Sequence, residues 1–431
     1  MTRCPDVPPP NSLKEALQFA GALSARYPEG SVGQELRRRI SEYAGKIAVN
    51  NYFTSTLDNL KQLREKLFNN SWNHGSYNNV QNTSPNCLAD TVTDWFPKFY
   101  CTLSYLNFNV NGDAYGGGQW QHQECSGSNG LSTWLKKGNE IPSASGPSSQ
   151  AKLWSGGFHG NDIKCRSATE FSSEMGTCVE DNGSKFPMLL SGILFLRPSS
   201  PELTSTFVVL VREICVIVTG ESEDGERHLH GFESRKALQG KFKSEYGSSP
   251  NYGSLKSCCK SLKSNIKTLI GNDSSDGALR IPNSSHELYL GMLNSDKISV
   301  YLKWLSQHLG SLIANLQQMH KDCTSWNPNS MSNGQAAGPF PYGFGFPNIG
   351  SWNNGQEVQD ALSKLTAEGS GGLPALQSHV TILITAYTSS STGTVAGSLL
   401  GTAAVGGAGA AVALNVGGVT TALKGAIGIL K

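Results

Sequence analysis

The residues best suited to chemistry in this sequence are its cysteines, which could form disulfides, bind a metal or act as nucleophiles. Ten are present, at positions 4, 87, 101, 125, 165, 178, 215, 258, 259 and 323. No two of them have the Cys-x-x-Cys spacing of a zinc site, and no histidines flank them at zinc spacing. Their even number permits complete pairing, although spacing does not give the pairs. The set therefore favours disulfides, and with them an oxidising compartment.

Individual cysteines differ in their surroundings. Cys101 and Cys215 lie within apolar, helix-like patterns, so we expect them to be buried free thiols. Cys258 and Cys259 are adjacent, and the simpler interpretation is two disulfides to different partners. A chemical role for this vicinal pair would need a nearby base, which the sequence does not identify.

Histidines suggest two further sites. His286-Glu287 begins like a zinc-protease motif, but the residue four positions after His286 is Leu290, so we expect a polar helix face. His228 and His230 could bind a metal as a His-x-His pair, yet a solvated loop is the favoured interpretation. Neither pair is assigned as a metal site.

Glycine-rich stretches do not complete a catalytic or phosphate-binding motif. Gly116–Gly118 follows no predicted strand and is expected to form a tight turn. Gly240-Lys241 lacks the upstream glycine of a phosphate-binding loop, and no Gly-x-Ser-x-Gly is present for a serine nucleophile. We therefore assign no catalytic, cofactor-binding or metal-binding residue, and we predict a non-enzymatic protein without a cofactor.

The elements that must position these side chains are predicted to be helices. Ser12 suits an N-cap, and apolar residues recur at spacings of three and four over about 13–27, 36–47 and 54–68. Short connections between them indicate a helical bundle. A fourth helix, about 87–108, contains Pro97, which is expected to kink it. Its aromatic residues have helical spacing and are expected in the core: Trp95, Phe96, Phe99, Tyr100 and Tyr105.

The segment 203–218 is rich in valine and isoleucine, which would also suit a strand. A helix is favoured because its apolar residues recur at three and four, with Arg212 and Glu213 opposite, and Pro201 suits a first turn. Further helices are predicted at about 252–270, 284–294 and 297–321. Polar stretches predict surface loops at 69–86, 137–190 and 220–250, the last as a mobile excursion.

The predicted fold class is mainly α: a loop-rich helical bundle with a hydrophobic, Gly/Ala-rich C-terminal segment. We predict a helical, cysteine-containing domain over 1–325 and a Gly/Pro/aromatic linker over 326–372, whose aromatics at 338–352 are exposed. An uncharged hydrophobic segment follows over 373–431.

Charge is strongly segregated at the C-terminal end. From Gly369 to Leu423, 55 consecutive residues carry no Asp, Glu, Lys or Arg. Within this stretch, 395–416 is long enough to cross a bilayer, but its glycines make insertion marginal. Three interpretations stay open: membrane association through 395–416, a lipid-anchor signal with small residues at 389–393, and a tail that packs in protein or is disordered.

Net charge and the N-terminus bear on partners and localisation. The net charge is +2 and basic residues are scattered, so no nucleic-acid partner is predicted. Met1–Pro10 is polar and proline-rich and lacks the apolar run of a conventional secretory signal. Export to an oxidising compartment would therefore need an atypical signal.

One block of the sequence resembles a known family. Phe96-Pro-Lys-Phe-Tyr-Cys-Thr-Leu-Ser-Tyr-Leu106 is similar to a block of the secreted antigen 1 family of Babesia, which is related to the variant erythrocyte surface antigen alpha subunit. Shorter matches occur in the same order along the chain. They lie at 13–19, 32–36, 60–66, 116–120, 131–135 and 401–418, so the resemblance covers nearly the whole sequence.

The resemblance implies an antigenically variable parasite protein that is secreted, or displayed on the infected erythrocyte or the parasite. It implies roles in host-cell interaction and immune evasion. The partner would be a host protein, an erythrocyte surface component or another parasite surface antigen. The alternative is a membrane-associated subunit of a variant erythrocyte surface antigen complex, which binds a protein partner through the tail or the aromatics of 338–352. The family has no known catalytic residues, so none is carried over.

Overall fold

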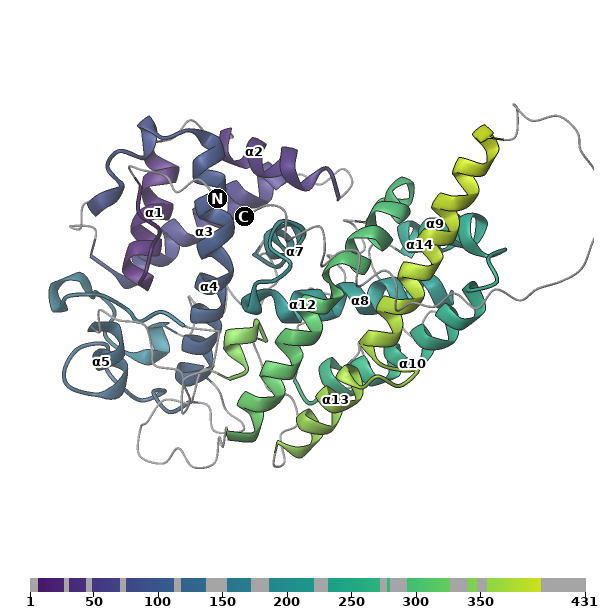
Figure 1. The fold of residues 1–431 in the computed structure, drawn as a ribbon. Helices are drawn as coiled ribbons and strands as arrows, with labels where there is room; N and C mark the ends of the chain where they lie inside the picture. Colours follow the sequence, from purple (N-terminus) through teal and green to yellow (C-terminus); the bar gives the residue numbers. More distant parts are fainter. Residues whose placement is uncertain are drawn as a thin grey trace, which may run out of the picture. The chain divides into compact units, whose positions relative to one another are not determined.

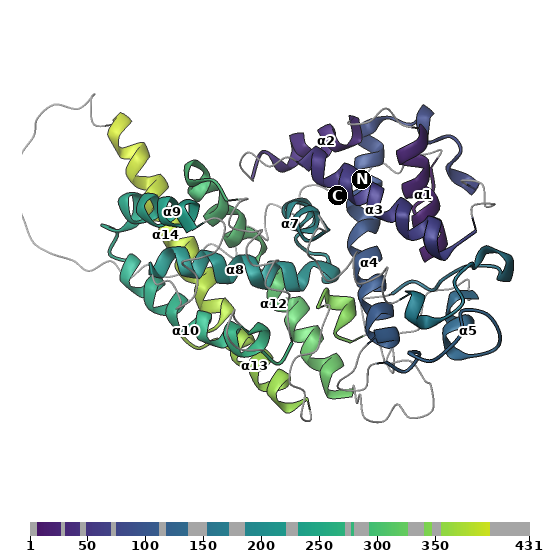
Figure 2. The same ribbon diagram turned by 180° about the vertical axis from the view of Figure 1, so that it is seen from behind.

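The described part of the chain is mainly helical, as the sequence predicts (Figures 1 and 2). β-Structure in this part is limited to isolated bridges between Phe68 and Ile163 and between Glu124 and Ser167. The computed structural model describes residues 7–26, 31–43, 49–69, 75–111, 118–136, 153–171, 186–220, 232–271, 277–279, 293–325, 340–346 and 355–396.

The helices of the described residues follow one another with short 3₁₀ turns between them. The α-helices are α1 (Leu13–Arg26), α2 (Ser31–Ile40), α3 (Val49–Leu67), α4 (Pro85–Asn111), α5 (Gly130–Lys136), α7 (Phe186–Leu196), α8 (Thr204–Thr219), α9 (Phe232–Tyr246), α10 (Tyr252–Ile270), α12 (Ile298–Ser325), α13 (Gln356–Thr366) and α14 (Leu373–Ala396). Among the 3₁₀ turns, η4 (Pro201–Leu203) precedes α8, and η8 (Tyr342–Phe344) lies between α12 and α13.

Contacts divide the chain into two compact units, Met1–Thr385 and Ala386–Lys431. The first unit contains the helices from α1 to α13 and the start of α14. The described part of the second, 386–396, is the helical end of α14. The predicted domains 1–325, 326–372 and 373–431 stay a prediction, although α13 shows that part of 326–372 is a packed helix.

Helices α1 to α4 and α7 pack on one another around an aromatic centre. Ser12 caps α1 as predicted, because its hydroxyl accepts the Glu15 amide proton at 3.3 Å. Trp95 of α4 lies 5.7 Å from Phe19 and 5.2 Å from Phe99, centroid to centroid, in edge-on contacts. The five aromatic residues predicted for this core are all buried: Trp95, Phe96, Phe99, Tyr100 and Tyr105.

A second group of helices packs around α8. Helix α8 contacts α9, α10 and α12 in this group and also contacts α7. The prediction of helix over strand is confirmed here. All 16 of its residues are buried, including Arg212 and Glu213, which the sequence places opposite the apolar stripe. A helix with neighbours on every side buries its polar face as well, and those groups must then be satisfied internally.

Helix α9 corrects the expected loop at 220–250. Its polar composition suggested a surface excursion, but 232–246 is helical and packs against α8. Leu238, Phe242 and Tyr246 lie four residues apart and are all buried. This spacing puts them on one face of a helix, where burial offsets the polar remainder.

The aromatic segment 340–346 also differs from expectation. Its aromatics were expected to be exposed in a linker, but the four described ones are buried: Phe340, Tyr342, Phe344 and Phe346. The Tyr342 ring lies 5.9 Å from that of Tyr105 and 5.2 Å from that of Phe108 on α4. Leaving such large rings in water costs more than ordering the turn that buries them.

Candidate functional site

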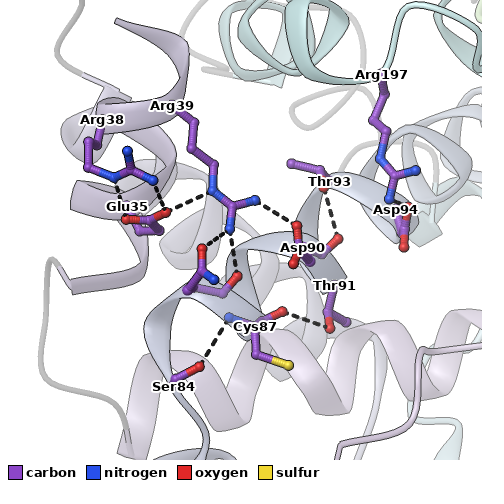
Figure 3. Close-up of polar contacts among 11 residues, drawn as sticks. Glu35, Arg38, Arg39, Ser84, Cys87, Asp90, Thr91, Thr93, Asp94 and Arg197 are labelled. Carbon is purple, nitrogen blue, oxygen red and sulfur yellow. Dashed lines mark hydrogen bonds and ion pairs between the residues drawn. The ribbon is translucent and has the colours of Figure 1, made fainter. Parts of the chain in front are cut away.

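A network of charged side chains joins α2 to α4 (Figure 3). Glu35 on α2 accepts hydrogen bonds from Arg38 Nε at 2.9 Å and Arg38 Nη2 at 2.8 Å. Arg39 Nε donates to the same carboxylate at 2.8 Å. Residues three and four apart lie on one side of a helix, so the sequence itself brings this carboxylate to both guanidinium groups.

Arg39 extends the network to α4. Its Nη1 donates to Asp90 Oδ1 at 2.6 Å, and its Nη2 donates to the Asn86 backbone carbonyl at 2.9 Å. The Asn86 side-chain carbonyl accepts from the same Nη2 atom. One guanidinium group thus fixes α2 against the first turns of α4, which suits the planar array of donors that arginine offers.

The start of α4 carries a second ion pair and several backbone caps. Asp94, one turn beyond Asp90, pairs with Arg197, which follows α7 (Figure 3). The Ser84 hydroxyl accepts the Cys87 amide proton at 3.3 Å, as an N-cap does. Cys87 is itself disulfide-bonded and is therefore no nucleophile in this state.

The electrostatics of the network suit binding better than proton transfer. The hydrogen bonds from Arg38 lower the pKa of Glu35 to about 2, so this carboxylate stays ionised and is a weak base near neutral pH. Partial desolvation raises the pKa of Asp94, although Arg197 pairs with it. The Arg38 side chain is 65% exposed. The exposed Arg38 guanidinium group is the part of the network that a charged partner could reach.

Replacing Glu35 with glutamine is expected to remove part of the acid sensitivity of the fold. The depressed pKa means that Glu35 contributes stability above about pH 4.5, which is lost as the pH falls toward 2. Because Arg38 is exposed, we expect about 1 kcal/mol after solvent screening. Urea titrations at neutral pH and at pH 3 measure it. Glu357→Gln, at an exposed carboxylate of α13, is the control; equal pH dependence in both variants would contradict the assignment.

A disulfide between Cys125 and Cys165 closes the loop region beside α5. Backbone hydrogen bonds flank it, from the Cys125 amide to the Arg166 carbonyl at 3.2 Å and from the Ala168 amide to the Gln123 carbonyl at 2.9 Å. Both cysteines are buried. The predicted use of cysteine for disulfides is confirmed for this pair.

The double variant Cys125→Ala/Cys165→Ala is expected to lose about 2–3 kcal/mol of unfolding free energy. The cross-link spans 40 residues of sequence, and chain-entropy arguments give up to about 4 kcal/mol for such a loop, less what residual structure in the unfolded chain retains. Urea unfolding under non-reducing conditions measures the change. A midpoint equal to that of the wild type would show that the loop is held by its other contacts.

Five cysteines of the described residues are free and buried: Cys101, Cys215, Cys258, Cys259 and Cys323. The prediction for Cys101 and Cys215 is confirmed. The prediction that Cys258 and Cys259 enter two disulfides is wrong for this structure. Both are buried on α10, which packs against α8 and α13.

The other sequence candidates do not form a site in the described residues. His286-Glu287, His228 and His230 lie outside the described residues, as does most of the predicted helix 284–294. Gly118 has φ +71°, consistent with a tight turn. No group of three or more His, Cys, Asp or Glu side chains in the described ranges is arranged to hold a metal ion.

The tail was expected to offer a membrane segment over 395–416, and 397–416 lies outside the described residues. Among the described helices, none combines the length and the apolarity that crossing a bilayer requires. Comparison with protein-family models, with curated proteins and with solved structures gives no match to this chain. The resemblance to the Babesia secreted antigens therefore stays a hypothesis drawn from the sequence.

Proposed function

We propose that this protein is a non-enzymatic antigen, secreted or displayed on the infected erythrocyte or the parasite, that acts in host-cell interaction and immune evasion. The observation that carries the proposal is the Cys125–Cys165 disulfide. Structural disulfides persist in oxidising surroundings and are rare in the cytosol. The sequence resemblance to the Babesia secreted antigen 1 family supplies the class of protein.

The distribution of burial supports a role in which the surface varies while the fold persists. One continuous apolar core extends from Val7 to Leu383. Glu35, Arg38 and Arg39 lie at its margin, where the Arg38 side chain is 65% exposed. A host protein, an erythrocyte surface component or another parasite surface antigen would meet this margin and the polar loops.

The test is fractionation of infected erythrocytes with an antibody to this chain, under rapid alkylation of free thiols. We expect the chain in the erythrocyte-membrane fraction or in the medium, with Cys125 and Cys165 protected from alkylation. A chain confined to the parasite cytosol, with both thiols alkylated, would overturn the proposal.

A second candidate is a membrane-associated subunit of a variant erythrocyte surface antigen complex that binds a protein partner. It is favoured by α14, which carries no Asp, Glu, Lys or Arg and whose Ile382 is 45% exposed. Ile382→Lys should release a co-purifying surface antigen while Thr381→Lys, at the neighbouring exposed position, should retain it. Equal retention by both variants excludes this face as the contact.

A further inference from the structure

Helix α10 carries a row of lysines along one face, made up of Lys256, Lys260, Lys263 and Lys267. Their spacings of four, three and four residues place them in one narrow sector of a helix. The row is about 16 Å long, because a helix rises about 1.5 Å per residue. Lys256, Lys260 and Lys267 are exposed, and Lys263 is half-buried. The net charge of +2 for the whole chain conceals this concentration of positive charge on one helix.

Helix α10 itself supplies no counter-charge to the lysine row. Neither Asp nor Glu occurs between Tyr252 and Ile270. Like charges three and four residues apart repel one another on a helix, so the row by itself weakens α10. Because the first turn also lacks an acidic residue, the positive end of the helix dipole adds to the potential at Lys256. An anionic polymer that lies along the row would remove this repulsion.

The packing of α10 uses its other faces. The helix contacts α8 and α13, and its apolar residues are buried. Asn265 Nδ2 donates to the Gly371 carbonyl at 3.1 Å, so the turn before α14 lies against this position. Nine residues are two and a half helical turns, so Asn265 is on the side opposite Lys256. The contact with Gly371 therefore does not cover the lysine row.

The side chains on and beside the row suit sulfate groups. A lysine ammonium group is a compact charge, and it lacks the planar array of donors with which arginine binds a single carboxylate or phosphate. Because α10 has four lysines and no arginine, it responds to the density of negative charge along a partner. Ser257 and Ser264 lie seven residues apart beside the row and are exposed, so their hydroxyls can donate to sulfate oxygens.

Two other anionic partners fit this helix less well. Helices that bind a lipid surface bury apolar side chains in it. Among the described residues, the large apolar side chains that are exposed belong to Ile382 and Tyr387 of α14, so α10 has none to bury in lipid. Single-stranded nucleic acid stacks its bases on aromatic side chains. Tyr252, the aromatic residue of α10, is half-buried and donates from its hydroxyl to the Val218 carbonyl at 3.1 Å.

We propose that the lysine row of α10 binds a linear sulfated polysaccharide, which lies along the helix with its sulfate groups against the ammonium groups. This goes beyond the proposed function and does not depend on it, because it concerns a property of the purified chain. Binding of this kind releases counterions from the polymer, so its affinity falls steeply as the salt concentration rises.

The experiment measures binding of a heparin octasaccharide to the purified full-length chain by isothermal titration calorimetry at several salt concentrations. Replacing the four lysines of the row with glutamine should raise the Kd by at least about tenfold and lower the salt slope by about 3, roughly 0.7 for each lost contact. The double variant Lys256→Gln/Lys267→Gln, at the ends of the row, should raise the Kd by about threefold.

The matched control removes four exposed lysines that are scattered over other helices, by the substitutions Lys61→Gln, Lys303→Gln, Lys321→Gln and Lys364→Gln. This variant has the same net charge as the four-fold row variant, and it should keep the affinity of the wild type. Equal weakening in both would show that binding follows net charge, and a wild-type chain that does not bind heparin would also overturn the proposal. Circular dichroism checks each fold; if the four-fold row variant is unfolded, an unchanged Kd in the double variant overturns the proposal.

Vesicles that contain phosphatidylserine and a DNA duplex are the competing ligands, measured at the same salt concentrations. Heparin should bind more tightly than either. Binding of the vesicles or the duplex as tightly as heparin would overturn the choice of a polysaccharide. These measurements use the purified chain, so their outcome is independent of where the protein resides.

Discussion

Replacing Arg235 with methionine is expected to lower the free energy of unfolding by about 4 kcal/mol. Arg235 on α9 donates from Nη2 to Glu213 Oε2 on α8 at 2.7 Å. The two side chains are 3% and 0% exposed. The other oxygen of Glu213 is buried without a hydrogen-bond partner in the described structure. Without Arg235, the fold must hold an ionised carboxylate away from water or protonate it, and both cost free energy.

The double variant Arg235→Met/Glu213→Leu separates the cost of a broken pair from the value of the pair. Removing both charges is expected to bring stability back to within about 1 kcal/mol of the wild type, because apolar residues replace desolvated ions. Lys241→Met, which breaks an exposed pair with Glu245 on the same helix, should cost less than about 0.5 kcal/mol. Urea unfolding followed by circular dichroism measures all three. A loss below about 1 kcal/mol in the single variant would mean that Glu213 keeps its solvation in the fold.

Helical periodicity predicted most of this fold, because burial of one apolar face largely decides which segments become helices. The stripes over 13–27 and 54–68 became α1 and α3, and 203–218 became α8. The missed helix α9 carried a signal of the same kind, since Leu238, Phe242 and Tyr246 are spaced by four. Most residues of 220–250 are polar, and this overall composition favoured a loop although the three apolar residues have helical spacing.

Hydrophobic periodicity does not predict contacts between segments that are far apart in the sequence. Glu35 with Arg38 and Arg39 follows from spacing on one helix, but the bond from Arg39 to Asp90 requires α2 to pack on α4. The bond from Arg235 to Glu213 likewise depends on the α8–α9 contact. Sequence spacing fixes neighbours within a helix, whereas the partners across an interface depend on the assembled core.

The same limit explains the aromatic segment 340–346. Glycine and proline mark a break in helical structure, and this part of the linker prediction had a sound physical basis. Glycine and proline do not show whether the aromatic side chains between them pack against another part of the fold. Here Tyr342 reaches Tyr105 and Phe108, and the Ser205 hydroxyl donates to the Gly345 carbonyl at 2.6 Å. The segment is therefore anchored on α4 and α8.

Replacing Gly345 with alanine is expected to cost about 4 kcal/mol and to loosen this anchored turn. Gly345 has φ +79°, and an added Cβ would lie 2.3 Å from the Glu202 carbonyl oxygen and 2.8 Å from Ser205 Oγ. The backbone contact cannot be relieved by a rotamer change, so η8 must move away from η4. That movement would also weaken the Ser205 bond and the packing of Tyr342.

Gly220→Ala is the matched control, because Gly220 ends α8 with φ +68° and an added Cβ there meets nothing within 4 Å. It should cost only the backbone strain of a left-handed alanine, about 1 kcal/mol. Urea unfolding gives both values, and near-ultraviolet circular dichroism reports the aromatic packing, which only Gly345→Ala should change. Equal losses in the two variants would show that the clash with Glu202 is absorbed. The difference between them isolates the close approach of the two 3₁₀ turns from the positive φ that both glycines share.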